Sequence, residues 1–188
     1  MIDAALACIA RGWATMPLAP RSKAPAGWLV PHGWKDATTD PAQARKWWGR
    51  TPTLGMGVPC EPSGLLVIDW DPRNGPDDLH DLEQRLGPLP LTVEVLTGGG
   101  GRHLYFQLPA FETRGELAPG VELKRRGYVV APPTIHPDTG RAYEWAEHPD
   151  ETPIAELPAD WLAAATSPHT SKRNCAGWLG TCGPSARN

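Results

Sequence analysis

Apolar residues along the chain follow two patterns, short runs typical of strands and wider spacing typical of helices. The clearest run is Leu65-Leu66-Val67-Ile68-Asp69-Trp70, with five apolar residues in six positions, which predicts one short, largely buried strand. Shorter runs predict strands at residues 15–18, 54–58, 91–96, 104–108, 120–124, 127–131 and 141–145. Helices are predicted at residues 2–14, 41–48, 77–86 and within 153–165. Short strands mixed with helices predict an α/β fold.

Some boundaries and one strand pairing can also be predicted. Asp3 is a candidate cap for the first helix, and Asp40 before a proline at the first helical position predicts where the second helix begins. The strand at 54–58 is expected to pair beside the strand that carries Asp69.

Asp69 and Asp71 end the clearest strand. Side chains alternate between the faces of a strand, so the two carboxylates point the same way and Ile68 and Trp70 the other. Two converging like charges need a cation between them, and Mg²⁺ or Mn²⁺ is the oxygen-preferring kind. A simpler interpretation is a strand that runs into an ordinary Asp-Pro turn.

A glycine-rich segment, residues 97–103, lies between two predicted strands. Its four consecutive glycines let the backbone approach a ligand closely, with amides such as those of Gly100 and Gly101 free to meet an anion. Arg102 and His103 would add two donors for a triphosphate. The segment is no P-loop, because a strand follows it and Gly-Lys-Ser/Thr does not. The alternative is a flexible hairpin with an incidental surface histidine.

A second carboxylate lies in the predicted strand 120–124. Val121 and Leu123 are expected to face inward, so Glu122 and Lys124 share the opposite face. His136 lies in a later turn and by itself predicts little.

Composition limits the class of protein. With 188 residues, the chain can form one compact domain or two small lobes sharing a cleft. Residues 1–165 contain the periodic elements, whereas 166–188 lack periodicity and are expected to be a tail or linker.

No apolar run approaches a bilayer span and no signal peptide is recognisable, so a soluble, cytoplasmic protein is expected. Four cysteines without CxxC pairing fit a reducing compartment. His169, Cys175 and Cys182 match no common zinc spacing.

Charge and aromatic residues bear on nucleic-acid binding. A formal net charge of −3 argues against a strongly basic clamp. Basic residues nevertheless cluster at 45–50 and 124–126, so local, salt-sensitive contacts are expected. Trp47 and Trp48 are expected to pack into the core rather than stack on bases, and the loop 20–39 is expected to be ordered, reaching toward a substrate.

The motifs GWKDATTD, SGLLVIDWD, TGGGGRHLYF and PGVELKRRGYVVAPPTIHP occur in this order and are followed by YEW. Together they resemble the bifunctional primase-polymerase domain of the archaeo-eukaryotic primase superfamily, found in plasmid and phage replication proteins, over about residues 4 to 162. The resemblance implies two small modules around a catalytic cleft, with a central mixed or antiparallel sheet. It also implies a DNA-dependent nucleotidyltransferase that starts chains and extends primers, so residues 1–165 would be its catalytic domain.

The resemblance also implies roles for particular residues. The Asp-x-Asp/Glu motif of the family corresponds to Asp69 and Asp71, its third carboxylate to Glu122, and its small-x-His motif to residues 101–103, with His103 contacting triphosphate. Two departures stand out: the third acid is often Asp in relatives, and the small residue here is Gly101 where many relatives have Ser. Lower-ranking candidates for phosphate or template contacts are Lys124, Lys23, Arg125 and His136.

The chemistry of such an enzyme fits these residues. Three carboxylates would hold two Mg²⁺ or Mn²⁺ ions, and the partners would be single-stranded DNA template, primer and dNTP or NTP. A helicase domain could follow if the native chain is longer. Two alternatives remain: another metal-dependent transferase or nuclease that uses the DxD site, or a non-catalytic single-stranded DNA-binding module with tryptophans as stacking platforms.

Overall fold

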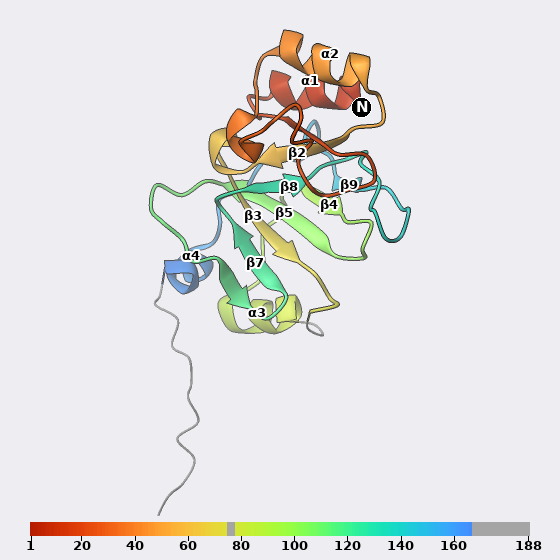
Figure 1. Ribbon diagram of the computed structural model, residues 1–188. Helices are drawn as coiled ribbons and strands as arrows, with labels where there is room; N and C mark the ends of the chain where they lie inside the picture. The colour runs from red at the N-terminus through yellow and green to blue at the C-terminus, as the bar shows by residue number, and fades with distance from the viewer. Residues whose placement is uncertain (75–77, 167–188) are drawn as a thin grey trace, which may run out of the picture.

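The computed structural model describes residues 1–74 and 78–166. The predicted tail after Thr166, with His169, Cys175 and Cys182, lies outside the described residues. The described part is an α+β fold with four α-helices and two antiparallel sheets (Figure 1). This confirms the predicted fold class with an antiparallel rather than mixed central sheet.

The larger sheet has six strands in the order β6-β7-β3-β5-β4-β9. The aspartate strand β3, Leu65–Trp70, lies inside it, with β5 and β7 as antiparallel neighbours. The other strands of this sheet are β4 (Glu94–Leu96), β5 (Arg102–Gln107), β6 (Glu116–Ala118), β7 (Val121–Lys124) and β9 (Glu144–Glu147). Because β3 has a paired strand on each side, its side chains project only from the two faces of the sheet. The residues on each face therefore determine what surrounds the carboxylates.

The smaller sheet has the order β1-β2-β8, with β1 at Met16–Leu18, β2 at Gly55–Pro59 and β8 at Tyr128–Val130. The prediction that strand 54–58 pairs beside the aspartate strand is therefore wrong. Gly57 helps to explain this placement, because a Cβ at that position would lie 3.0 Å from the ring of Tyr128 and 3.2 Å from Met16. The absence of side chains at Gly55 and Gly57 lets their strand pack closely between its actual neighbours, which an apolar pattern alone does not reveal.

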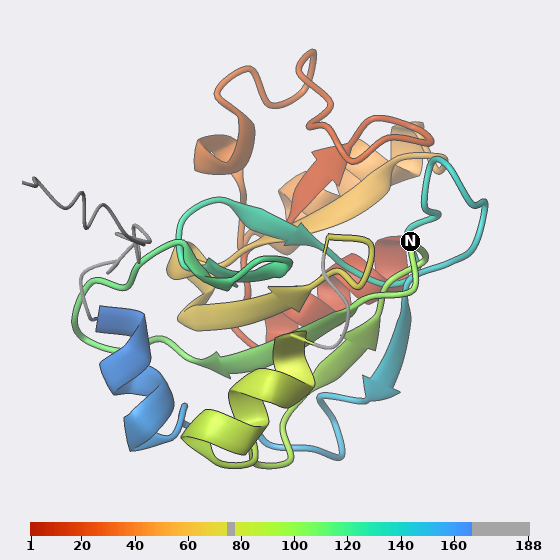
Figure 2. The same cartoon turned by 90° about the horizontal axis from the view of Figure 1, so that it is seen from below.

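Two helices cover each side of the molecule. Helices α1 (Ile2–Ala10) and α2 (Pro41–Arg50) lie together at the top of Figure 1, above the small sheet. Helices α3 (Asp78–Leu86) and α4 (Ala159–Thr166) lie against the opposite face of the large sheet (Figure 2). Two short 3-10 helices, η1 (Gly33–Asp36) and η2 (Glu61–Ser63), lie in the connections.

The two predicted helix starts have different outcomes. The Asp40 side chain accepts a hydrogen bond of 2.9 Å from the Ala42 backbone N–H, so α2 begins as the Asp-Pro pair predicts. The prediction of a cap at Asp3 is wrong, because α1 begins at Ile2 and Met1 is the capping residue without a side-chain bond. Asp3 lies in the first turn, where its charge interacts favourably with the helix dipole.

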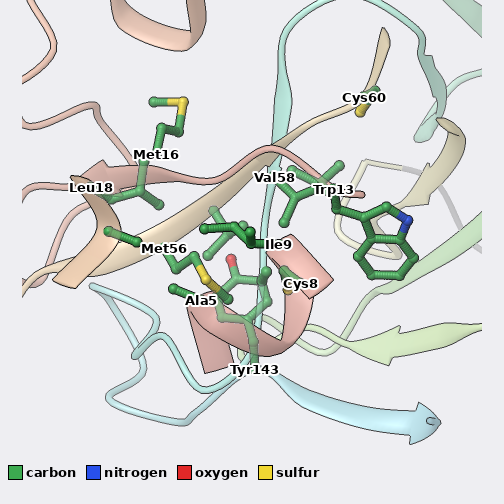
Figure 3. Packing of buried hydrophobic residues seen from close by; sticks show 14 of the residues in the cluster. Ala5, Cys8, Ile9, Trp13, Met16, Leu18, Met56, Val58, Cys60 and Tyr143 are labelled. Carbon is green, nitrogen blue, oxygen red and sulfur yellow. The ribbon is translucent and has the colours of Figure 1, made fainter. Parts of the chain in front are cut away.

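The large sheet separates two hydrophobic cores. Leu65 and Val67 of β3 face the first core with α1, α2 and the small sheet, whereas Leu66 and Ile68 face the second core with α3 and α4. Figure 3 shows part of the first core, where Ile9 of α1 packs with Met56 of β2. By alternation, Asp69 belongs to the face of the first core. No helix in the described residues is long and apolar enough to cross a membrane.

Candidate active site

Three predicted site residues lie in one row across the large sheet. Asp69 of β3 is in register with His103 of β5 on one side and with Glu122 of β7 on the other. Directly opposed residues on antiparallel strands have side chains on the same face, with Cβ atoms about 4.5–5.5 Å apart. Strand pairing therefore brings together an acid, a histidine and a second acid that are distant in the sequence.

Asp71 joins this row beyond the end of β3. Its backbone N–H donates a 2.9 Å hydrogen bond to the Gly120 carbonyl, which keeps the chain beside the turn into β7. Gly120 has a φ of 80° and a Cβ there would lie 2.9 Å from the Asp71 carbonyl oxygen, so only glycine fits this close approach. Asp71 is thereby held on the same side as Asp69.

A pocket of about 300 Å³ lies over these residues, between the two sheets. Small-molecule sites begin at roughly this size, about 300 Å³. It is lined by Lys23, Asp69, Asp71, Arg73, Asn74, Thr97, His103, Gly120, Glu122, Lys124, Tyr128, Val129, Val130 and Tyr143. Acids and cations thus face one another around a single cavity.

Arg73 binds Asp71 from two residues along the chain. Its Nε lies 2.9 Å from Oδ1 and its Nη2 2.5 Å from Oδ2 of Asp71, and its backbone N–H also donates to Oδ1 at 3.0 Å. Hydrogen bonding from the Arg73 side chain lowers the pKa of Asp71 below its ordinary value, against the opposing effect of burial. Asp71 is consequently an ionised, oriented carboxylate.

Lys124 links the other two acids. Its ammonium group forms an ion pair with Glu122 and lies 3.7 Å from Oδ2 of Asp69. Burial alone would lower the pKa of Lys124, but the hydrogen bond to Glu122 and the charge of Asp69 raise it above its ordinary value. The pocket therefore holds three carboxylates, each within ion-pair distance of a cation.

His103 is deeply buried, with 5% of its surface exposed. Its Nε2 lies 3.5 Å from Oδ1 of Asp69. Burial lowers the pKa of His103 below its ordinary value, and the charge of Asp69 opposes that effect only in part. The ring is neutral near pH 7 and can donate one hydrogen bond through its protonated nitrogen.

Aromatic side chains form a column behind His103. The ring of Tyr143 lies 5.9 Å from that of His103 and 6.0 Å from that of His136, which stacks on it at 21°. Burial raises the pKa of Tyr143 to about 12. His136 is only 1% exposed and packs against Tyr143, so the structure shows no free surface of this side chain, and its contact with a template stays a prediction.

The glycine segment plays a different part from the predicted one. Gly100 and Gly101 donate their backbone N–H groups to the carbonyl and the side-chain oxygen of Thr97, so these two amides are not free for an anion. A Cβ at Gly101 would lie 2.2 Å from the Trp70 carbonyl oxygen. The absence of this side chain lets the turn pack against the end of β3, where it positions the aspartates.

Two predicted cations lie away from the pocket. Arg102 is in register with Trp70 and Leu96, on the sheet face opposite His103, where its Nη2 lies 2.7 Å from Oε2 of Glu94. The reason is strand alternation, since Arg102 and His103 are adjacent in β5. Arg125 bonds to Glu61 and to the carbonyls of Pro109 and Phe111, with 13% of its side chain exposed. Neither residue faces the cavity.

The carboxylates fit a divalent cation by their chemistry. Oxygen donors are the ligands that Mg²⁺ and Mn²⁺ prefer, and Asp69 and Glu122 are close cross-strand neighbours on one face. Within residues 1–74 and 78–166, no three His, Cys, Asp or Glu side chains already lie close enough together to hold a metal ion. Arg73 and Lys124 instead neutralise the acids, so a metal would exchange with these cations for the carboxylate oxygens.

Several lining residues were missed by the sequence reasoning. Arg73 could have been found, because it follows Asp71 in a Pro-Arg turn that returns its side chain to the carboxylate. Tyr143 and Thr97 gave no such signal, since their approach depends on loops that meet only in the folded chain.

The fold and the pocket together define an α+β protein with an acid- and cation-lined site between two antiparallel sheets. The model of the Prim-Pol family, described as the N-terminal domain of bifunctional DNA primase/polymerases, matches residues 5–161, and the chain therefore belongs to this family. Membership supports DNA primase/polymerase activity in general, with DNA and nucleotides as substrates. No curated protein is similar enough to the chain to match it.

Proposed function

We propose that the pocket catalyses template-directed nucleotidyl transfer from a (d)NTP to a 3′-hydroxyl during DNA replication of the plasmid or phage type. The observation that carries the proposal is the single row of Asp69, His103 and Glu122 across three strands, with Asp71 beside it. Phosphoryl transfer demands mainly positioning and charge neutralisation from a protein. Both requirements suit a pocket whose charged groups are fixed by sheet register.

Asp69, Asp71 and Glu122 would hold Mg²⁺ or Mn²⁺, which supplies charge stabilisation for the attacking and leaving oxygens of an in-line displacement. The protein's own contribution is orientation. Asp69 is fixed by β3 pairing on both sides, and Asp71 by its backbone bond to Gly120. Glu122 is the least constrained acid, with 49% of its side chain exposed.

The cations and His103 are assigned to the triphosphate. Neutral His103 donates from the floor of the pocket, and Lys124 and Arg73 become available to phosphate oxygens once their carboxylate partners bind metal. Lys23 lines the same cavity, and no side-chain bond holds it among the described residues. These groups would neutralise the charge of the leaving pyrophosphate.

The test is metal-dependent incorporation of labelled dNTPs and NTPs on a primed single-stranded template. We expect incorporation by the wild-type protein with Mg²⁺ or Mn²⁺ and loss of it in Asp69→Asn, which keeps the side-chain size and removes the charge. Asp160→Asn on α4 is the matched control and should retain full activity. Extension by Asp69→Asn at the wild-type rate would refute the site.

The same protein preparation separates the alternatives. Shortening of the labelled strand without added nucleotide would indicate a nuclease, and turnover of a UDP-sugar with an acceptor would indicate a sugar transferase. DNA binding that needs no metal, without any turnover in either assay, would indicate a non-catalytic module.

A further inference from the structure

Positively charged side chains are distributed unevenly over the fold. In residues 1–74 and 78–166, six Lys and Arg side chains form no ion pair or side-chain hydrogen bond, and all six lie between residues 21 and 50. They are Arg21, Lys23, Lys35, Arg45, Lys46 and Arg50. This segment contains two acids, Asp36 and Asp40, so it is locally basic in a chain of net charge −3. Its cations are free to meet an external anion.

An exposed tryptophan lies among these cations. Trp28 is 65% exposed, and among the described residues it is the most exposed tryptophan. It lines a shallow hollow of about 450 Å³ with Gln43, Lys46 and Arg50, whose helix α2 supplies the opposite wall. Trp47 and Trp48 of the same helix are buried at 6% and 1%, as the sequence predicts. Of these three tryptophans, only Trp28 keeps its ring largely exposed for stacking.

The hollow is connected to the active-site pocket by the chain itself. The segment between β1 and α2 projects away from the large sheet at the top of Figure 2. Lys23 lines the active-site pocket and Trp28 lines the hollow, five residues further along. The Tyr128 hydroxyl donates a 2.8 Å hydrogen bond to the Lys23 carbonyl and anchors the loop at its pocket end. Unpaired cations thus occur at the pocket, with Lys23, and on α2, with Lys46 and Arg50, and the loop that carries Trp28 joins the two.

We propose that the residues of this segment that we call the basic surface (Arg21, Lys23, Trp28, Lys35, Lys46 and Arg50) bind single-stranded DNA and lead the template into the pocket. The path of the DNA template into the pocket rests on the proposed function, whereas the binding of single-stranded DNA to this surface does not. Unpaired cations attract a phosphate backbone, and an exposed aromatic ring stacks on any base. An acidic protein partner would pair with the cations. Its acidic groups would not stack on the exposed Trp28 ring beside the hollow.

Binding to a labelled oligodeoxynucleotide, measured by fluorescence anisotropy without nucleotide or metal, tests the proposal. Trp28→Ala should weaken binding by about 5- to 150-fold, the range for loss of one stacked base, and Trp28→Tyr should restore most of it. Lys46→Glu should weaken binding and lower the salt slope by about 1. Arg85→Glu makes the same charge change at another exposed position, on α3, and should leave affinity unchanged.

The outcomes separate this proposal from the proposed function. Wild-type affinity in both Trp28→Ala and Lys46→Glu would overturn the basic surface, even if the enzyme were active. Unchanged DNA binding by Asp69→Asn together with lost incorporation would support both proposals. Binding by a wild-type protein that incorporates nothing would overturn the proposed function alone.

Two further measurements guard against misfolding and against the rival partner. Photo-crosslinking of the wild-type protein to a bromouridine-containing strand should label peptides that contain Trp28 or Lys46, and labelling confined to other peptides would overturn the proposal. Sedimentation without DNA should give the same mass for wild type and Lys46→Glu. A dimer that Lys46→Glu abolishes, with DNA affinity unchanged, would make the surface an interface between two copies and overturn the proposal.

Discussion

The active-site pocket and the basic surface treat positive charge in opposite ways. In the pocket, Arg73 and Lys124 lie against Asp71 and Glu122, so each cation has a carboxylate partner. On the basic surface, Lys46 and Arg50 have no partner in the described part of the chain. Paired charges hold a defined geometry, whereas free charges attract a flexible polyanion. The comparison shows that a net charge of −3 conceals two regions that differ in whether their cations are paired.

The largest expected effect separates the two regions by function. Glu122→Gln removes one carboxylate charge from the pocket, so we expect nucleotide incorporation to fall by roughly 10²- to 10³-fold. Affinity for single-stranded DNA should stay at the wild-type value, because the basic surface is intact. Glu144→Gln, at an exposed position of β9, is the control and should keep both properties. Equal loss of binding and incorporation in Glu122→Gln would show that the two regions are not separable.

A second prediction compares how tightly the regions are packed. Gly101→Ala places a Cβ 2.2 Å from the Trp70 carbonyl oxygen, so it should lower the free energy of unfolding by about 3 kcal/mol. Gly27→Ala in the basic surface loop has no atom within 4 Å and should change stability by less than about 0.5 kcal/mol. Urea unfolding measures both. Similar values for the two variants would contradict the close contact between the glycine turn and β3.

A third prediction concerns pH and the pocket. Because burial lowers the pKa of His103 in the folded state, the unfolded chain binds its proton first as pH falls below about 6.5. Stability should therefore decrease as pH falls through and below that value, with His103 contributing at most about 1.4 kcal/mol per pH unit. Urea unfolding from pH 8 to pH 5 should show a shallower decrease for His103→Gln. The buried His136, whose pKa burial also lowers, would contribute to the slope that remains.

The smallest effect comes from breaking one ion pair in the pocket. Arg73→Ala should raise the pKa of Asp71 toward its ordinary value, observable by NMR titration of the carboxyl carbon. In the wild type the lowered pKa adds stability that is present above about pH 3.9 and is lost as pH falls through the folded-state pKa. The pair is partly exposed, so the loss at pH 7 should be about 0–1 kcal/mol. An unchanged Asp71 titration would mean that Arg73 does not hold this carboxylate in solution.

Much of the pocket could be predicted from local periodicity. Alternation along β3 and β7 places Asp69 and Glu122 on the faces opposite Ile68 and Leu123, and the structure puts both acids on the same side of one sheet. The same rule, applied strictly to β5, would have put Arg102 on the face opposite His103. The error came from treating the two residues as part of a loop, whereas β5 begins at Arg102.

What the sequence could not supply were contacts between distant segments. The pairing of β2 with β1 and β8 depends on which strands accept the narrow backbone of Gly55 and Gly57, and no local pattern records that choice. The sequence suggested that the amides of Gly100 and Gly101 were free to bind an anion, because their hydrogen bonds to Thr97 depend on the geometry of the turn. The burial of His136 under Tyr143 likewise appears only when two loops meet.

The position of β3 between two cores ties its chemistry to its folding. Sliding this strand by one residue against its neighbours would turn Asp69 toward the apolar side chains beneath α3 and α4 and turn Ile68 toward the pocket. Burying an unpaired carboxylate in that layer costs several kcal/mol, so a chain in which β3 is misaligned would not fold stably. A molecule that reaches the native state therefore carries its acids on the correct side as a condition of having folded at all.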